Sequence, residues 1–360
     1  MCPKLSMVSF KSNQIRQIDP EALQPQMRWL ILTDNQITAL PSTIGRCTKL
    51  QKFMLSGNLI KKLPAEISSC VGLELIRLAS NKLEQPPMEL LQLPKLSWVA
   101  FSDNPFLSVH APSDEHLKVF DNDILDDASA GIELGKGASG ITRKYTTSVS
   151  VDGQDAEVDV AVKEYYSTIT SDGNPLEERK VSMVASSLAC KSFIKVLGQT
   201  RASNLIMELL RDYTVFANPP SLESCSRDVY DDDLTITVSR AVHMVGHLLY
   251  ALMKLHEQGI CHGDFYGHNI LLSTVDENQV WCTDFGAAFF YEKDCEYGKL
   301  IEKVERRAFG HLVNEIADLL VSGDDSDVKD KLQELASSCD TLTFGELHRK
   351  WGEFKADSLG

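Results

Sequence analysis

Residues 73–83 read Leu-Glu-Leu-Ile-Arg-Leu-Ala-Ser-Asn-Lys-Leu, with apolar residues at the first, fourth, sixth and eleventh positions and an asparagine at the ninth. Related frames recur, with asparagines spaced 22, 23, 23 and 23 residues apart: Asn13, Asn35, Asn58, Asn81 and Asn104. One such repeat is too short to bury an apolar face alone, so neighbouring repeats must stack through short strands, with each asparagine bonding backbone groups in the turn that follows. Amphipathic helices are disfavoured because prolines follow Leu40 and Leu63.

This frame resembles the leucine-rich repeat family over residues 1–106. The resemblance implies an α/β leucine-rich repeat solenoid whose stacked strands form a concave surface for extended partners. We therefore expect the array to recruit a protein. Its strand face is expected to carry too few basic or aromatic side chains to indicate a particular ligand chemistry.

Residues 107–124 lose the repeat frame and are predicted to form a linker, which is short enough that the two domains should touch. A second domain is predicted over residues 125–360, because the pattern changes there to strands followed by long helices. Residues 158–163 alternate as a strand does, whereas 241–255 and 306–320 carry apolar residues at helical spacing.

Composition limits the classes of partner. The formal net charge is −15, so the average surface should repel nucleic acid. No stretch of about 20 apolar residues would cross a membrane. The nine cysteines are scattered and form no Cys-x-x-Cys pair, which argues against a disulfide framework or a zinc site. These features predict a cytoplasmic protein with no nucleic-acid or membrane partner.

Five short motifs follow one another in the second domain: Gly135-x-Gly137-x-x-Gly140, Val160-Ala161-Val162-Lys163, Met207-Glu208, His262-Gly263-Asp264 with Asn269, and Asp284-Phe285-Gly286. A glycine-rich loop alone would also suit a dinucleotide-binding fold. Here, however, a lysine strand follows it, where that fold would need an acidic residue about 20 positions on. The set and its order resemble the protein kinase family over about residues 125–360. The resemblance implies a two-lobed α+β domain that transfers the γ-phosphate of ATP.

The same resemblance assigns roles to the nucleotide-binding residues. The three glycines would cover the phosphates, and Lys163 would bind them, since an inward-facing lysine needs an anion. Glu178 is predicted to pair with Lys163, and Glu177 is the alternative. The hinge that holds adenine is assigned to the segment after the apolar strand: Met207, Glu208 and Leu210.

The resemblance also assigns the chemistry. Asp264 would orient the acceptor hydroxyl and accept its proton, while Asn269 and Asp284 would bind Mg²⁺. An aspartate and an asparagine five residues apart on one loop can face the acceptor and the metal together. His262 is assigned a structural role, holding the loop through hydrogen bonds to backbone.

Several positions depart from the family pattern. Gly263 replaces an arginine, so the loop lacks the cation that grips a phosphorylated activation segment, and we expect activity without such phosphorylation. Tyr266 stands where serine/threonine kinases place a lysine, so His268 or metal alone would have to neutralise transition-state charge. Glu305 follows Asp284 by only 21 positions, which predicts a shortened platform for a peptide substrate. The insertion at 211–233 has no assigned role.

Transfer to a serine or threonine hydroxyl of a protein is the expected reaction, with tyrosine left open as an acceptor. Two alternatives remain. A small-molecule kinase resembling aminoglycoside and choline phosphotransferases would suit the short activation segment. A pseudokinase scaffold would bind nucleotide and signal by shape.

Overall fold

The computed structural model describes residues 4–107, 117–120, 125, 127–137, 139–151, 154–166, 169–321 and 326–359. The amino-terminal repeats form one parallel sheet whose strands follow chain order: β1 (Met7–Ser9), β2 (Trp29–Ile31), β3 (Lys52–Met54), β4 (Leu75–Arg77) and β5 (Trp98–Ala100). Short helical turns connect the strands: η1 (Pro20–Ala22), η2 (Ser42–Arg46), η3 (Ala65–Ser69) and α1 (Met88–Leu91).

The repeated asparagines hold the turns as predicted. The Asn81 side-chain nitrogen donates to the Leu55 and Leu78 carbonyl oxygens at 2.9 and 3.0 Å, and its oxygen accepts from the Ile60 amide at 3.1 Å. Asn35, Asn58 and Asn104 make the same kind of bond, so each of these four asparagines joins its own repeat to the preceding one. The buried apolar residues of the frame, such as Ile76 and Leu78, fill the interior of the array.

The second domain begins with a five-stranded antiparallel sheet in the order β6-β7-β8-β10-β9. Its strands are β6 (Ile132–Lys136), β7 (Gly140–Val151), β8 (Gln154–Tyr165), β9 (Val196–Gln199) and β10 (Leu205–Glu208), and the helix α2 (Pro175–Ser187) precedes β9. The strand predicted at 158–163 lies within β8. Part of the predicted linker extends this sheet, because the Phe120 amide donates to the Gln199 carbonyl at 2.9 Å. Residues 108–116 and 121–124 of that linker lie outside the described residues.

The remaining lobe is mainly helical, with α3 (Val238–Glu257), α4 (Glu296–Asp318), α5 (Ser326–Ser338) and α6 (Phe344–Leu359). The helices predicted at 241–255 and 306–320 correspond to α3 and, up to its end at Asp318, to α4. Two small sheets complete the lobe: β11 (Tyr213–Val215), β13 (Ile270–Ser273) and β14 (Val280–Cys282), and β12 (Ile260–Cys261) with β15 (Phe289–Phe290). None of the described helices is long and apolar enough to cross a lipid bilayer.

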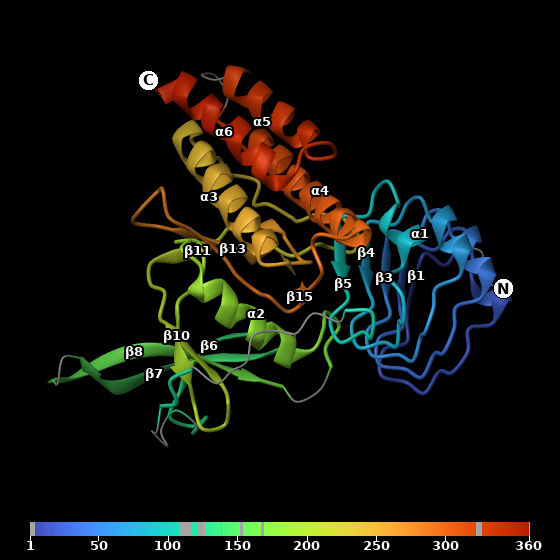
Figure 1. Ribbon diagram of the computed structural model, residues 1–360, viewed down its shortest axis with the longest axis horizontal. Coiled ribbons are helices and arrows are strands. Elements are labelled where there is room, and N and C mark those ends of the chain that lie inside the picture. The colour runs from blue at the N-terminus through green and yellow to red at the C-terminus, as the bar shows by residue number, and fades with distance from the viewer. Residues whose placement is uncertain are drawn as a thin grey trace.

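The array packs against the helical lobe with the β4 and β5 end of its sheet (Figure 1). Leu75 and Trp98 join the apolar core of that lobe. Phe101 packs edge-on against Phe289, with the two ring centroids 5.5 Å apart. The prediction that the domains touch is therefore confirmed. The expectation of an open concave surface is wrong for β4 and β5, because the protein's own second domain covers them, and Met54 of β3 joins the same core.

The expected shortage of basic and aromatic side chains on this face is also wrong. Strand residues that point away from the array interior include Trp29, Lys52, Arg77 and Trp98. Alternation along each strand places the residues between the frame's apolar positions on the outer face. The repeat frame leaves these positions unrestricted, so their character follows from what packs on them.

Candidate active site

A cleft of about 260 Å³ lies between the sheet and the helical lobe. Seven of the predicted site residues line it: Gly135, Lys163, Glu178, Met207, Glu208, Leu210 and Asp284. Apolar side chains, including Leu134, Ala161 and Leu271, contribute the rest of its walls. A deep apolar slot with a few convergent polar groups is the usual form of a site for a nucleotide-sized ligand.

The other two glycines of the loop shape its turn. The Gly137 amide donates to the Gly140 carbonyl at 2.9 Å, which closes the loop between β6 and β7. A Cβ on Gly140 would collide with the Glu164 carbonyl of β8, whereas one on Gly137 would meet no atom within 4 Å. Gly140 is therefore required by the packing of β7 against β8, whereas the surroundings of Gly137 would admit a side chain.

Lys163, which is partly exposed to the cleft, forms an ion pair with the buried Glu178, between β8 and α2. The Asn174 side chain caps α2 by accepting from the Leu176 amide at 3.0 Å, which fixes the helix start near Glu178. Glu177 instead pairs with Lys180 at 2.7 Å, so of the two glutamates only Glu178 contacts Lys163.

The charge of Lys163 is stabilised by its neighbours. Burial by itself lowers the pKa of this ammonium group, but Glu178, then Tyr165 and Asp284, more than offset it, so the pKa is raised. Lys163 is therefore a fixed cation inside the cleft, as a binding site for phosphate oxygens requires.

Asp264 lies on the loop after β12, and Asn269 ends the short helical turn η6 (Gly267–Asn269). The Asn269 side-chain nitrogen donates to the Asp264 backbone oxygen at 2.8 Å and to its carboxylate Oδ2 at 3.2 Å. Burial alone would raise the pKa of Asp264, but the charges of Arg77, His268 and His262 outweigh it and lower the pKa. The carboxylate is therefore ionised and can accept a proton.

Glu305 on α4 holds the start of this loop. Its carboxylate accepts hydrogen bonds from the His262 amide at 2.9 Å and the Gly263 amide at 2.6 Å, and it lies 2.7 Å from His256 Nε2. The His262 ring is buried and lies 3.1 Å from the Thr283 carbonyl oxygen. Both histidines thus contact fixed acceptor groups, and the geometry agrees with a structural role for His262.

Asp284 reaches the cleft from a left-handed backbone conformation, with φ of 58°. Its Oδ1 accepts from the Gly286 amide at 3.1 Å. The oxygens of Asp284 and Asn269 are the hard donors that Mg²⁺ prefers. No group of three or more His, Cys, Asp or Glu side chains among the described residues resembles a metal cage. The donor set fits a cation that takes its remaining ligands from phosphates and water.

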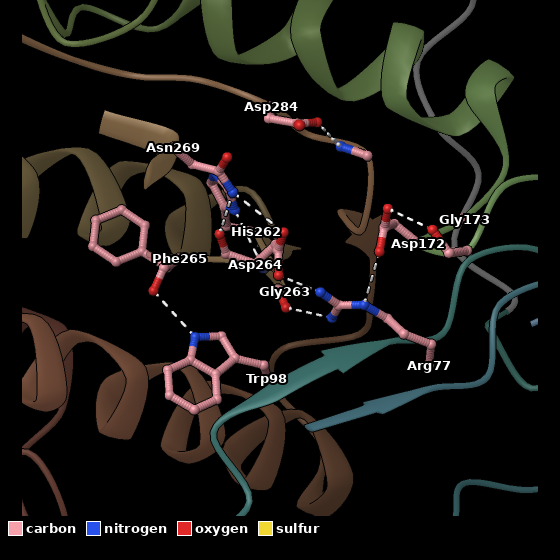
Figure 2. Close-up of polar contacts among 12 residues, drawn as sticks. Arg77, Trp98, Asp172, Gly173, His262, Gly263, Asp264, Phe265, Asn269 and Asp284 are labelled. Carbon is pink, nitrogen blue, oxygen red and sulfur yellow. Dashed lines mark hydrogen bonds and ion pairs between the residues drawn. The ribbon is translucent and has the colours of Figure 1, made fainter. Parts of the chain in front are cut away.

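The repeat array contributes Arg77, which the sequence did not indicate as a functional residue. From β4, its Nη1 donates to the Gly263 carbonyl at 2.9 Å, Nη2 contacts the Asp264 carboxylate, and Nε lies 3.3 Å from Asp172 Oδ1 (Figure 2). Only its position on the outer face of a repeat strand was visible in the sequence. Nothing local relates it to a loop 187 positions away.

Trp98 of β5 also reaches the loop. Its indole ring stacks on Tyr266 with centroids 4.2 Å apart and planes at 7°, and its Nε1 donates to the Phe265 carbonyl at 3.1 Å. Tyr266 is only 5% exposed. The residue that replaces a family lysine thus serves as a packing surface for the array.

The insertion at 211–233 fills the space between the array and the loop. Asp228 accepts from the His268 amide at 3.0 Å and lies 2.7 Å from the His268 ring nitrogen Nδ1. Burial lowers the pKa of His268, but the hydrogen bond to Asp228 and nearby carboxylates outweigh it and raise the pKa. The Arg227 guanidinium carbon lies 4.9 Å from the centroid of the Trp98 ring. The insertion therefore braces both the loop and the array.

Comparison with known proteins agrees with this geometry. A model of the protein kinase domain matches residues 130–305, and a leucine rich repeat model matches residues 25–83. Among solved structures, a leucine-rich repeat protein of Leptospira interrogans is 37% identical over 28% of this chain and 26% of its own, with a TM-score of 0.27. No curated protein matches the sequence significantly. The chain therefore contains a protein kinase domain, preceded by leucine-rich repeats.

Proposed function

We propose that this protein transfers the γ-phosphate of ATP, with Mg²⁺, to a serine or threonine hydroxyl of a protein. The observation that carries the proposal is the convergence of the Lys163–Glu178 pair and Asp284 on one apolar cleft, beside a loop that holds an ionised Asp264. The kinase family match supports a protein acceptor over a small molecule.

Each residue has a distinct part in this reaction. Leu134, Ala161 and Leu271 would enclose the adenine, and the hinge of Met207, Glu208 and Leu210 would bind its edge. Lys163 would hold phosphate oxygens, since its ammonium group is fixed by Glu178.

The oxygens of Asp284 and Asn269 would hold Mg²⁺, which neutralises charge on the phosphates when bound. Asp264 would orient the acceptor hydroxyl and take its proton. Its carboxylate offers about four acceptor positions, so bonds from Arg77 and Asn269 leave capacity for the substrate.

Recruitment of a protein by the repeats remains part of the proposal, but the partner would bind a different part of the array from the whole strand face. Because the second domain covers β4 and β5, a partner would use the strand face nearer β1 or the outer turns. A cytoplasmic location likewise remains a prediction.

Transfer of labelled phosphate from ATP to candidate proteins, with the Asp284→Ala variant beside the native chain, tests the reaction. We expect transfer to serine or threonine that falls roughly 10³-fold in the variant, because Asp284 acts on phosphate charge through the metal. Equal labelling by both proteins would contradict an enzymatic role for this cleft. Nucleotide binding without turnover on any acceptor would favour the pseudokinase, and turnover only on aminoglycosides or amino alcohols the small-molecule kinase.

A further inference from the structure

The guanidinium group of Arg77 lies where three parts of the protein meet. It comes from the repeat array, contacts the Gly263 carbonyl and Asp264 carboxylate of the catalytic loop, and approaches Asp172 in the segment before α2 (Figure 2). The Arg77 side chain is 2% exposed. A buried cation bonded to two carboxylates and a carbonyl is held in one position, because breaking the arrangement would leave buried charge uncompensated.

Gly263 explains why the cation comes from the array. The residue has φ of +75°, a conformation that favours glycine. A Cβ there would collide with the Val99 carbonyl of β5 and lie 2.8 Å from the Ala287 carbonyl. An arginine cannot occupy position 263 while β5 packs at this point. The missing motif arginine and the guanidinium on β4 are therefore two consequences of the same docking.

The contact with Asp172 extends the arrangement to the other lobe. Asp172 lies in a tight turn whose Asp172 and Gly173 amides donate to the Thr170 hydroxyl at 3.1 and 3.0 Å. A Cβ on Gly173 would lie 2.6 Å from the Gly286 carbonyl and 3.0 Å from Ser102 Oγ, so the turn is wedged between the array and the Asp-Phe-Gly segment. The helix that carries Glu178 begins directly after this turn, at Pro175.

We propose that Arg77 is a positioning residue for phosphoryl transfer, supplied by the repeat array in place of the arginine that the catalytic loop lacks. It fixes the orientation of Asp264 through the carboxylate and the preceding carbonyl. Through Asp172 it also fixes the start of α2, and with it the Lys163–Glu178 pair. The array is thereby part of the catalytic unit, and this inference rests on the proposed kinase function.

The first experiment measures phosphoryl transfer by the full chain carrying Arg77→Ala, Arg77→Met or Arg77→Lys. The matched control is Arg46→Ala, which removes an exposed arginine of the same array that pairs with Glu21 at 3.6 Å. We expect kcat to fall about 10²-fold in Arg77→Ala and Arg77→Met with KM for ATP nearly unchanged, because misplacing a reacting group by about 1 Å costs roughly that factor. Arg77→Lys should retain part of the activity, and Arg46→Ala all of it.

Chemical rescue separates positioning from general loss of structure. Millimolar guanidinium should restore activity to Arg77→Ala about tenfold and leave native and Arg46→Ala proteins unchanged, since the ion can occupy the vacated position. Unchanged kcat in Arg77→Ala would overturn the proposal. Increased kcat would also overturn it, and would mean that the array restrains Asp264 in an inactive state.

Hydrogen exchange gives a readout that does not need activity. Amides of residues 263–266 and 171–174 should exchange faster in Arg77→Met than in Arg46→Ala, if Arg77 holds both segments. Equal protection in the two variants would overturn the inference even where the native protein is active. A native protein that transfers no phosphate but shows the expected exchange difference would contradict the proposed function and leave the positioning contact supported.

Discussion

Two ion pairs, each with one buried partner, organise the candidate site, and they differ in how far they reach along the chain. Lys163 and Glu178 are 15 residues apart and join two elements of the same lobe. Arg77 and Asp264 are 187 residues apart and join the repeat array to the catalytic loop. The first pair follows a family pattern, whereas the second exists only because one domain docks on the other. A candidate catalytic loop can therefore be contacted by a residue from an attached repeat array.

The largest expected effect comes from breaking the first pair. We expect Lys163→Met to lower kcat roughly 10³-fold or more, because the variant lacks the cation that binds phosphate oxygens. Guanidinium should give no rescue here, in contrast to Arg77→Ala. Steady-state kinetics with added guanidinium would check this, and rescue of both variants would remove the distinction between the two pairs.

Removing Trp98 tests the docking that creates the second pair. Trp98→Ala should lower the free energy of unfolding by about 3–5 kcal/mol, as other large-to-small changes in a packed core do. The indole ring stacks on Tyr266 and bonds the Phe265 carbonyl, so its loss also loosens the loop.

The matched control lies at the opposite end of the array, where Phe10 is 54% exposed. Phe10→Ala should change stability by less than about 0.5 kcal/mol. Denaturant unfolding of the two variants measures the difference. Similar losses in both would mean that the β5 end of the array is no more firmly docked than the β1 end.

The smallest expected effect concerns the insertion that braces the second pair. Burial raises the pKa of Glu315 on α4 to about 7, and this carboxyl group bonds the Tyr230 hydroxyl at 2.7 Å. The folded state then binds more protons than the unfolded state between the ordinary glutamate value near 4.5 and about pH 7. The contribution of Glu315 to the free energy of unfolding is fully present below pH 4.5 and is lost as pH rises through 7.

Glu315→Gln isolates this contribution. The difference in unfolding free energy, native minus variant, should fall by about 2–3 kcal/mol between pH 4.5 and 7, at 1.36 kcal/mol per pKa unit. His311, one turn earlier on α4, has its pKa lowered to about 3 by burial and by Arg227 and Arg307, and so titrates in the opposite sense. Because both proteins contain His311, its contribution cancels in the difference. A difference that does not vary with pH would contradict the raised pKa.

Most of the candidate cleft could be predicted because its residues occur in short motifs. Each motif places a residue type where the local backbone requires it. Gly140 lies where β7 passes close to the Glu164 carbonyl of β8, and Lys163 lies within β8. Glu178 was predicted to pair with Lys163, and the structure confirms it. The sequence left Glu177 open as the alternative, because the helix rotation that turns Glu178 inward depends on the packing of α2. The role of Asp228 in the insertion could not be predicted from the sequence either, since its partner His268 is 40 residues away.

The sequence by itself determined the stacked repeats and the order of the elements that line the cleft, because periodic burial and local backbone requirements depend on nearby residues. Tertiary structure alone decided what the outer face of β4 and β5 contacts. Outward positions such as Arg77 and Trp98 are not needed to bury a repeat's own core, so the repeat frame does not constrain them. Their role follows from the surface that packs against them, and here that surface is the loop carrying Asp264.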